Sequence, residues 1–347
     1  MRGVSVEEFL SAAQSGQLAV FDVRSPAEFA RGAIPGAHAL PLFSDEERHQ
    51  VGLTYHNAGR HEAIKRGLEI VGPKMRWYVE QVEQILQPGQ QVGLYCWRGG
   101  MRSAALAWLL GFYGFEVITL RGGYKAFRRF VLEVVEQPRP YIILSGMTGA
   151  GKTSLLRTIA SKGEAVVDLE HLASHRGSVF GALGMPPQPT QQQFENMLAV
   201  ELWKHRTAER VWIEDESRQI GNLCIPQGMW LQMRAAPIIA LDVPVEQRLE
   251  HLCAEYGKYP PAQLAACLDK IRGRLGTERW SRARAALEQG DIREVARIAL
   301  EHYDKAYRHS LRKRTHLVQW ISVSSADDPA SAVLAVASVA EQRCYAE

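Results

Sequence analysis

The sequence lacks long apolar runs and is poor in metal-ligand patterns. No run of about 18 apolar residues occurs and the N-terminus has no apolar signal region, so we expect a cytoplasmic protein with no membrane association. Its five cysteines include no CxxC pair, which argues against a zinc ribbon and a disulfide framework. Cys224, Cys253 and Cys267 are expected in or near the core. His171 and His175 would share a helix face, but without a third ligand they do not predict a metal site.

Net charge is also low, at +3, but it is unevenly distributed. Between Asp269 and Arg314, thirteen Lys and Arg stand against seven Asp and Glu, a local charge of +6. A basic segment on a near-neutral protein is typical of a polyanion-binding protein. The alternative is a set of solvated helix faces with mixed charge.

Aromatic side chains are interleaved with basic ones near the end of that segment. The residues are Tyr303, Tyr307, His302 and His309 among Lys305, Arg308, Arg312, Lys313 and Arg314. Such a pattern suits stacking on unpaired bases beside phosphate contacts. An amphipathic helix with an aromatic core face explains it equally well.

Short apolar strands alternate with helical stretches along most of the chain, which predicts an α/β fold with parallel sheets. We expect strands at 18–22, 91–95, 117–120, 141–144, 165–169, 211–214 and 237–242, and helices at 103–112 and 152–160. Two prolines in 136–140 mark a domain boundary. The predicted domains are therefore 1–136 and 137–347, and the second includes a helical, basic part at about 245–320.

One cysteine opens a turn rich in glycine and arginine, between a predicted strand and a predicted helix. In the turn that follows Cys96, backbone N–H groups and the positive end of a helix are expected to stabilise the thiolate of Cys96. Gly99 and Gly100 let the backbone fold around an anion, and Arg98 and Arg102 add charge-assisted hydrogen bonds. The C-x5-R spacing leaves room for a phosphate-sized group, and a buried, inert cysteine is the alternative.

A second anion-binding loop, GMTGAGKT at 146–153, matches G-x-x-x-x-G-K-[ST] between a strand and a helix. Its amides are expected to bind a diphosphate, its lysine to neutralise the charge, and its threonine to ligate Mg²⁺. The predicted ligand-binding residues are Gly146, Thr148, Gly149, Gly151, Lys152, Thr153 and Ser154. The motif supports diphosphate binding more directly than nucleotide hydrolysis.

A Walker-B carboxylate is expected at the end of a nearby strand. Asp168, Glu214, Asp215 and Asp242 all have suitable positions. We favour Glu214 and Asp215, because several polar groups converge in the stretch WIEDES at 212–217. Helix capping or surface exposure is an equal alternative for each of the four.

The first domain resembles the rhodanese family. FDVRSPAE at 21–28, GAIPGAH at 32–38 and LRGGY at 120–124 are similar to its D-x-R-x-x-x-E, G-x-I-P-G-A and L-x-G-G elements. Together with Cys96 these segments cover almost the whole domain. The cysteine loop is one residue longer than the usual rhodanese pattern, which argues against simple thiosulfate sulfurtransferase activity. A phosphate-containing ligand and a cysteine-dependent phosphatase both stay open.

The whole chain resembles the bacterial tRNA 2-selenouridine synthase family in domain order, length and both loops. The resemblance implies lysine, glutamate and glutamine tRNAs with wobble 2-thiouridine as substrates, geranylated with geranyl diphosphate and then given selenium from selenophosphate. It implies no tightly bound cofactor, with Mg²⁺ optional. An ATP- or GTP-dependent kinase or NTPase with a rhodanese-like sulfurtransferase or phosphatase module, without a nucleic-acid substrate, is the alternative.

The two loops would divide this work. The P-loop with Lys152 would hold the diphosphate, beside an apolar channel for the geranyl chain. The Cys96 loop, with Arg98 and Arg102, would hold selenophosphate, and Cys96 is a candidate carrier of selenium as a selenenyl sulfide. The basic helical part would hold the tRNA.

Overall fold

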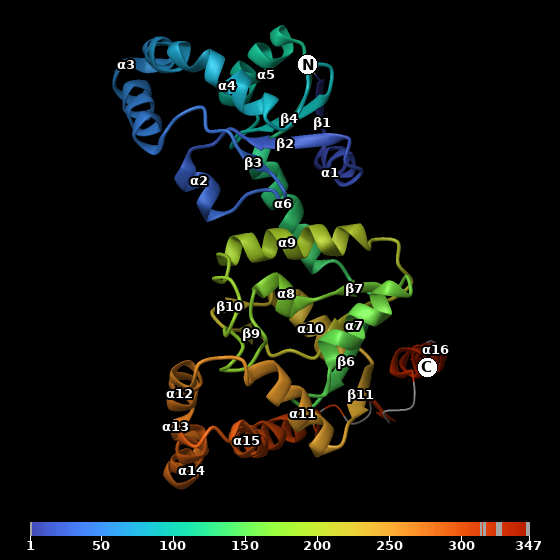
Figure 1. Cartoon of the computed structure of the whole chain (residues 1–347). Helices are drawn as coiled ribbons and strands as arrows, with labels where there is room; N and C mark the ends of the chain where they lie inside the picture. Colours follow the sequence, from blue (N-terminus) through green and yellow to red (C-terminus); the bar gives the residue numbers. More distant parts are fainter. Residues whose placement is uncertain (1, 313, 315–316, 324–327, 345–347) are drawn as a thin grey trace. The chain divides into compact units, whose positions relative to one another are not determined.

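The computed structural model describes residues 2–312, 314, 317–323 and 328–344 (Figure 1). The chain forms two compact units. The first comprises Met1–Val134 with Glu195–Val200, and the second comprises Val135–Phe194 with Glu201–Glu347. Lys313 of the predicted basic cluster lies outside the described residues. Within those residues, no helix combines the length and the apolar character that a membrane crossing requires.

The first unit is built on a five-stranded parallel sheet, as the alternating pattern predicted. Its order is β1 (Arg2–Val4), β5 (Glu116–Leu120), β4 (Gln91–Tyr95), β2 (Leu18–Asp22) and β3 (His38–Ala39). Parallel strands bury both faces under crossover helices, which explains their nearly continuous apolar sequences. The strands predicted at 18–22 and 91–95 are confirmed to the residue.

Helices cover both faces of this sheet. They are α1 (Val6–Gln14), α2 (Pro26–Arg31), α3 (Asp45–Val71), α4 (Met75–Glu83), α5 (Met101–Tyr113) and α6 (Gly123–Glu136), with a 3₁₀ turn at Gly72–Lys74. Tyr78 of α4 and Leu110 of α5 pack with Leu94 in one core cluster. Gly93 faces the other side, where an added Cβ would lie 2.9 Å from Phe9 of α1.

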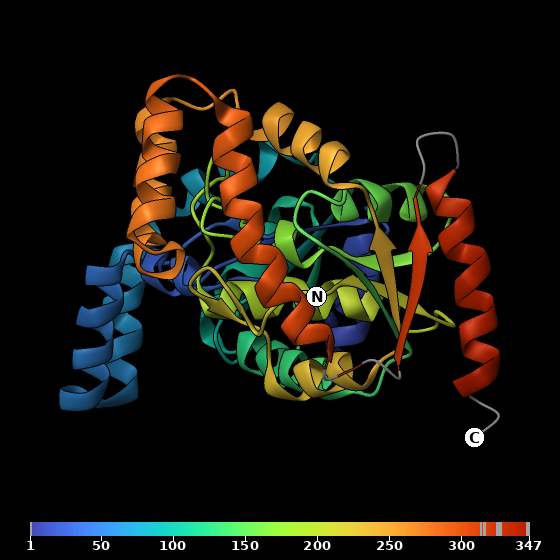
Figure 2. The same cartoon turned by 90° about the horizontal axis from the view of Figure 1, so that it is seen from below.

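Helix α3 is a bent element that the strand–helix pattern did not predict. Its backbone breaks at Gly59, where φ is +84°, a value that favours glycine. The break folds the helix into two limbs, the blue pair lying side by side in Figure 2. Arg66 on the second limb donates to the side chain of Gln50 on the first, at 3.1 Å.

The second unit contains another five-stranded parallel sheet. Its order is β12 (Val318–Ser322), β11 (Ile238–Asp242), β6 (Tyr141–Gly146), β8 (Val211–Glu214) and β7 (Ala165–Val167). Four of these strands were predicted, and β12 was not. Figure 2 shows β12 as the orange-red arrow beside the gold β11.

The helices of this unit fall into two groups. Around the sheet lie α7 (Lys152–Ser161), α8 (Leu169–Ala173), α10 (Gln227–Ala235) and α16 (Pro329–Cys344). Helix α9 (Gln191–Lys204) is divided between the units, since its residues Glu195–Val200 belong to the first. Leu156 and Ile159 of α7 share a core with Val333 and Ala337 of α16. The other group, α11 (Val245–Tyr256), α12 (Pro261–Lys270), α13 (Arg272–Leu275), α14 (Thr277–Glu288) and α15 (Ile292–Arg312), has its own apolar cluster, which confirms the predicted helical region.

A short antiparallel hairpin interrupts the second unit. It consists of β9 (Gln219–Ile220) and β10 (Leu223–Cys224). Cys224 is exposed there, so the expectation that it packs in the core is wrong, whereas Cys267 is buried and Cys253 is half-buried. A cysteine at the end of an edge hairpin has little apolar surface to pack against.

Candidate functional sites

The Cys96 loop joins strand β4 to helix α5 and depends on two tightly placed glycines. Gly99 has φ of +65°, and a Cβ there would lie 2.8 Å from the carbonyl oxygen of Leu120. Gly123 has φ of +59°, and a Cβ there would collide with the carbonyl oxygen of Cys96. The LRGGY segment at 120–124 therefore packs directly against the backbone of the cysteine loop.

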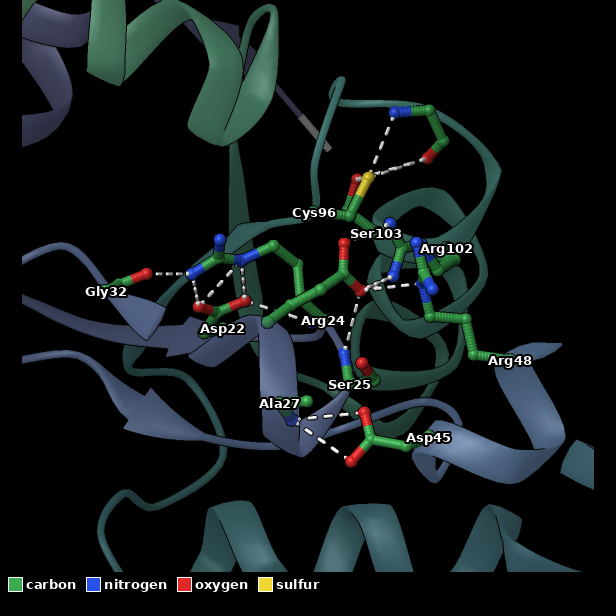
Figure 3. Close-up of polar contacts among 12 residues, drawn as sticks. Asp22, Arg24, Ser25, Ala27, Gly32, Asp45, Arg48, Cys96, Arg102 and Ser103 are labelled. Carbon is green, nitrogen blue, oxygen red and sulfur yellow. Dashed lines mark hydrogen bonds and ion pairs between the residues drawn. The ribbon is translucent and has the colours of Figure 1, made fainter. Parts of the chain in front are cut away.

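The sulfur of Cys96 lies inside a set of hydrogen-bond donors (Figure 3). The N–H of Gly100 donates to Sγ at 3.2 Å and the hydroxyl of Ser103 donates at 3.3 Å. Burial opposes ionisation, but donors from Ser103, Gly100 and Arg98 outweigh it and lower the pKa of Cys96 below its ordinary value. The loop thus favours the thiolate, the nucleophilic form of cysteine.

The two predicted arginines differ in their surroundings. Arg102 forms an ion pair with Glu28 at 2.6 Å, and Arg48 reaches the same carboxylate at 3.1 Å. Burial of Glu28 is outweighed by these arginines, which lower the pKa of its carboxyl. Arg98 is exposed, and its side chain has no partner among the described residues. Arg98 is therefore available to an incoming anion, whereas an anion at Arg102 must compete with Glu28.

A buried ion pair beside the loop explains the D-x-R sequence. Arg24 binds Asp22 at 2.5 Å, and neither side chain is more than 1% exposed. The same guanidinium donates to the carbonyl of Gly32 at 2.7 Å and lies 3.7 Å from the ring centre of Tyr124. The N–H of Tyr124 in turn donates to the carbonyl of Cys96 at 2.8 Å. These residues hold the loop in place and do not form part of its anion-binding surface.

The P-loop has the strand–turn–helix geometry that its sequence predicts. It follows β6 and opens α7, whose first N–H groups have no intrahelical acceptors and can bind an anion. Gly149 and Gly151 have φ of +82° and +76°, and a Cβ on Gly149 would lie 2.8 Å from the carbonyl of Arg248. Lys152 Nζ donates to the carbonyl of Gly146 at 2.8 Å. Ser154 lies in the first turn of α7.

Helices α11 and α15 brace this loop, which the sequence did not indicate. Arg248 donates to the carbonyl of Thr148 at 3.1 Å and pairs with Asp304 at 2.6 Å. His251 Nδ1 lies 2.9 Å from the carbonyl of Gly149. The helical region therefore fixes the P-loop backbone as well as carrying basic side chains.

Two carboxylates near Thr153 were missed by the sequence interpretation. Glu170 accepts a hydrogen bond from the Thr153 hydroxyl at 3.0 Å. Burial, and then the nearby Glu170, raise the pKa of Glu216 to about 8, and the two side chains share a hydrogen bond. Burial likewise raises the pKa of Glu170. The pair thus holds a proton close to Lys152, whose charge partly opposes these shifts.

The favoured Walker-B candidates lie elsewhere. Glu214 is buried and accepts the N–H of Leu169 at 2.9 Å, and burial raises its pKa well above the ordinary value. Asp215 pairs with Arg314 at 2.8 Å and accepts from Ser145. Glu170 is the carboxylate that contacts Thr153, and the assignment of Glu214 and Asp215 stays a prediction. The position of Glu170 at the start of a five-residue helix gave no usable sequence signal.

The remaining candidates include a helix cap, an exposed strand end and the two histidines. Asp168 caps α8 by accepting the N–H of His171 at 2.7 Å, and Asp242 is exposed at the end of β11. Helix α8 ends at Ser174, where φ is +49°, so His175 lies outside it and the predicted shared helix face is wrong. Among the described residues, no three His, Cys, Asp or Glu side chains form a cluster suited to a metal ion.

The two tyrosines of α15 face the protein, whereas His309 is exposed. The hydroxyl of Tyr307 lies 2.8 Å from that of Ser145, and Tyr303 lines an apolar cavity. The alternative of an aromatic core face therefore accounts for these tyrosines better than base stacking. Within the predicted cluster of basic and aromatic residues, Lys305, Arg308 and Arg312 have exposed side chains, whereas Arg314 is buried against Asp215.

The fold and the two loops define a class of protein with a rhodanese-like unit followed by a P-loop unit. Comparison with known families agrees. A model described as "Rhodanese-like domain" matches residues 5–130, and one described as "tRNA 2-selenouridine synthase AAA domain" matches residues 139–327.

Relatives extend this similarity to nearly the whole chain. The tRNA 2-selenouridine synthase of Cupriavidus pinatubonensis is 36% identical over 331 residues, 85% of this chain and 89% of that protein. Its counterpart in Hahella chejuensis is 36% identical over 351 residues, 91% of each chain. The Psychromonas ingrahamii protein is 33% identical and covers 87% of this chain and 90% of its own. The chain belongs to the tRNA 2-selenouridine synthase family, and it is an enzyme.

Proposed function

We propose that this enzyme converts wobble 2-thiouridine in tRNA to 2-selenouridine in two steps. Geranyl diphosphate first alkylates the sulfur, and selenium from selenophosphate then replaces the geranylthio group. The observation that carries the proposal is the presence of two different glycine-rich loops in one chain, one built around a cysteine with a lowered pKa and one around a lysine. The relatives' name supplies the tRNA and the selenouridine product.

The P-loop supports the first step. The uridine sulfur attacks C1 of the geranyl group, the C1–O bond breaks, and diphosphate leaves with the electron pair. Lys152 and the free amides at the start of α7 would stabilise the charge that develops on this leaving group. The hydroxyl of Thr153 and the carboxylate of Glu170, which share a hydrogen bond, would hold Mg²⁺ on the diphosphate, and the ion would neutralise part of its charge.

The Cys96 loop supports the second step. Selenium must reach C2 of the base while the C2–S bond breaks and geranylthiol leaves. The donors around Cys96 Sγ suit a reactive thiolate, and the exposed Arg98 beside them suits the phosphate of selenophosphate. Exposed Lys305, Arg308 and Arg312 support tRNA binding through phosphate contacts.

A nucleoside analysis tests the proposal. Purified protein is incubated with 2-thiouridine-containing tRNA and geranyl diphosphate, selenophosphate is then added, and the nucleosides are identified by mass spectrometry. We expect S-geranyl-2-thiouridine after the first addition and 2-selenouridine after the second. Unchanged tRNA with intact substrates would reject the proposal. Turnover of ATP or GTP without tRNA would then favour the kinase or NTPase alternative.

A further inference from the structure

A large apolar pocket lies in the first unit, beside the Cys96 loop. It is enclosed by the two limbs of α3, the segment before them and the first turns of α5. Met101 and Arg102, which belong to the cysteine loop, also line the pocket. Ser103, the next residue, donates its hydroxyl to Cys96 Sγ. The pocket and the reactive sulfur are therefore linked by consecutive residues.

The size and lining of the pocket suit a small apolar ligand. Its volume is about 530 Å³, within the range of about 300–1,000 Å³ that is usual for small-molecule sites. Apolar side chains from both limbs of α3 face it, including Val51, Ile64 and Val71. Four large apolar lining residues are 48–66% exposed, namely Leu53, Tyr55, Leu68 and Met101. A contiguous exposed apolar surface of this kind usually marks a binding site.

One part of the lining is basic. Arg48, Arg60 and Arg102 belong to the pocket wall, and two of them meet at Glu28. An apolar body with a cationic side suits an apolar chain attached to a polar, phosphate-bearing molecule. An S-prenylated nucleotide within a tRNA has this character.

The cavity beside the P-loop is much smaller. It is apolar, lined by Thr148, Leu252, Tyr256 and Tyr303 among others, but its volume is only about 50 Å³. This is room for a few water molecules, since one occupies roughly 10–15 Å³ by this measure. This cavity is too small for a ten-carbon chain, and the geranyl channel near the P-loop stays a prediction.

We propose that the pocket between the α3 limbs and α5 binds the geranyl chain of S-geranyl-2-thiouridine during the second step. This assignment rests on the proposed function and adds a substrate site to it. The bound chain would place C2 of the modified base at the Cys96 loop, and the pocket would retain the leaving geranylthiol. The enzyme would then select geranylated over unmodified tRNA for selenium insertion.

The chemistry at this site balances without a further redox partner. The Cys96 thiolate attacks C2, the C2–S bond to the geranylthio group breaks, and the leaving geranylthiolate takes the selenol proton of selenophosphate. Selenium then attacks C2 and forms the C2–Se bond, while the bond from C2 to Cys96 breaks and the thiolate is restored. Water finally cleaves the P–Se bond, which releases phosphate and returns a proton to N3 of the base. None of these steps needs an oxidant or a reductant.

A pocket-filling variant tests the assignment. Ala104 and Ala105 of α5 are both exposed, but only Ala105 lines the pocket. Ala105→Trp and Ala104→Trp would be compared on chemically S-geranylated tRNA with selenophosphate. We expect kcat/KM for selenation to fall at least about tenfold in Ala105→Trp only, from lost burial of the chain. Equal rates in both variants would overturn the assignment.

Geranylation of 2-thiouridine tRNA by the same variants separates the two steps. We expect both variants to geranylate normally. If Ala105→Trp lost geranylation as well while remaining folded by circular dichroism, the pocket would serve geranyl diphosphate and the second-step assignment would be rejected.

A second measurement uses the unmodified enzyme and does not depend on the folding of a variant. Selenation is followed with tRNAs carrying S-geranyl-, S-dimethylallyl- or S-methyl-2-thiouridine. We expect KM to rise with each shortening, by at least about tenfold from geranyl to methyl. An equal KM for all three would overturn the pocket while leaving the two-step reaction intact. Failure to convert any of them would instead reject the proposed second step.

Discussion

The two predicted anion-binding loops share a strand–turn–helix geometry but present different functional groups, a thiol in one and an ammonium group in the other. Each follows a parallel strand, turns on glycines with positive φ and opens a helix. In the first loop the donors converge on Cys96 Sγ and favour its thiolate form. In the second, the cation Lys152 turns back to the carbonyl of Gly146. The comparison indicates that one loop provides a nucleophile and the other stabilises a leaving group.

The largest effect should come from removing that nucleophile. Cys96→Ser is expected to reduce selenation about 10³-fold or more, because a serine hydroxyl is not ionised at neutral pH. Geranylation should stay within about threefold of the unmodified enzyme, as measured by mass spectrometry of the tRNA. Cys224→Ser, at an exposed cysteine, is the matched control. Equal loss of both reactions would show that the loops do not divide the work.

Removal of the cation should have the converse effect. Lys152→Ala is expected to slow geranylation by about 10²–10³-fold, since a preorganised charge on the leaving group is lost. Selenation of tRNA that is already geranylated should be unchanged. Lys162→Ala, at the other end of α7, removes a lysine whose partner is the exposed Asp328 and serves as the control. Normal geranyl transfer by Lys152→Ala would remove the P-loop from the reaction.

A smaller effect is expected from weakening the donors around the sulfur. Ser103→Ala removes the hydroxyl that donates to Cys96 Sγ and should raise the thiol pKa. Iodoacetamide labelling of the Cys96 peptide at pH 7 should slow by roughly three- to tenfold, with its pH profile moved to higher pH. An unchanged profile would assign the lowered pKa to the loop amides alone.

The smallest effect concerns the protonated carboxyl pair beside the P-loop. The pKa of Glu216, about 8, lies above the value of about 4.3 for an unfolded glutamate. Its stabilising contribution is complete below the unfolded value and is lost as the pH rises through 8. The glutamine in Glu216→Gln cannot ionise. The Tm of this variant should therefore rise relative to that of the unmodified enzyme between pH 5 and pH 9. We expect about 2–4 °C for each kcal/mol of unfolding free energy that the unmodified enzyme loses.

Thermal unfolding across this pH range measures the difference. Glu209→Gln, at an exposed glutamate, provides the comparison and should show no pH-dependent gain. If Glu216→Gln lost Tm relative to the unmodified enzyme as the pH rose, the pair would not carry a proton at neutral pH.

Local sequence signals predicted the two loops and most of the sheet strands. Strands 91–95 and 211–214 were found to the residue because buried parallel strands are continuous apolar runs bounded by glycine or charge. Strand β12 was missed because five helices, α11 to α15, separate it in the sequence from its partner β11. Local periodicity carries no information on such a pairing.

At both sites, the sequence predicted the residues of contiguous motifs but not the contacts between distant elements. Cys96, Gly99 and Lys152 were identified because their motifs are contiguous. The link between Glu170 and Thr153 was not, because the two residues come from different elements and meet only in three dimensions. The bend of α3 at Gly59, which forms the apolar pocket, was also not evident from the sequence.

The late return of the chain to the second sheet has a practical consequence. Strand β12 pairs with β11 along its whole length, and α16 covers the core that also contains Leu156 and Ile159 of the P-loop helix. A truncation before residue 318 would expose the edge of β11 and an apolar face, a combination that promotes aggregation. Recombinant fragments designed for work on the P-loop unit therefore need to keep residues 318–344.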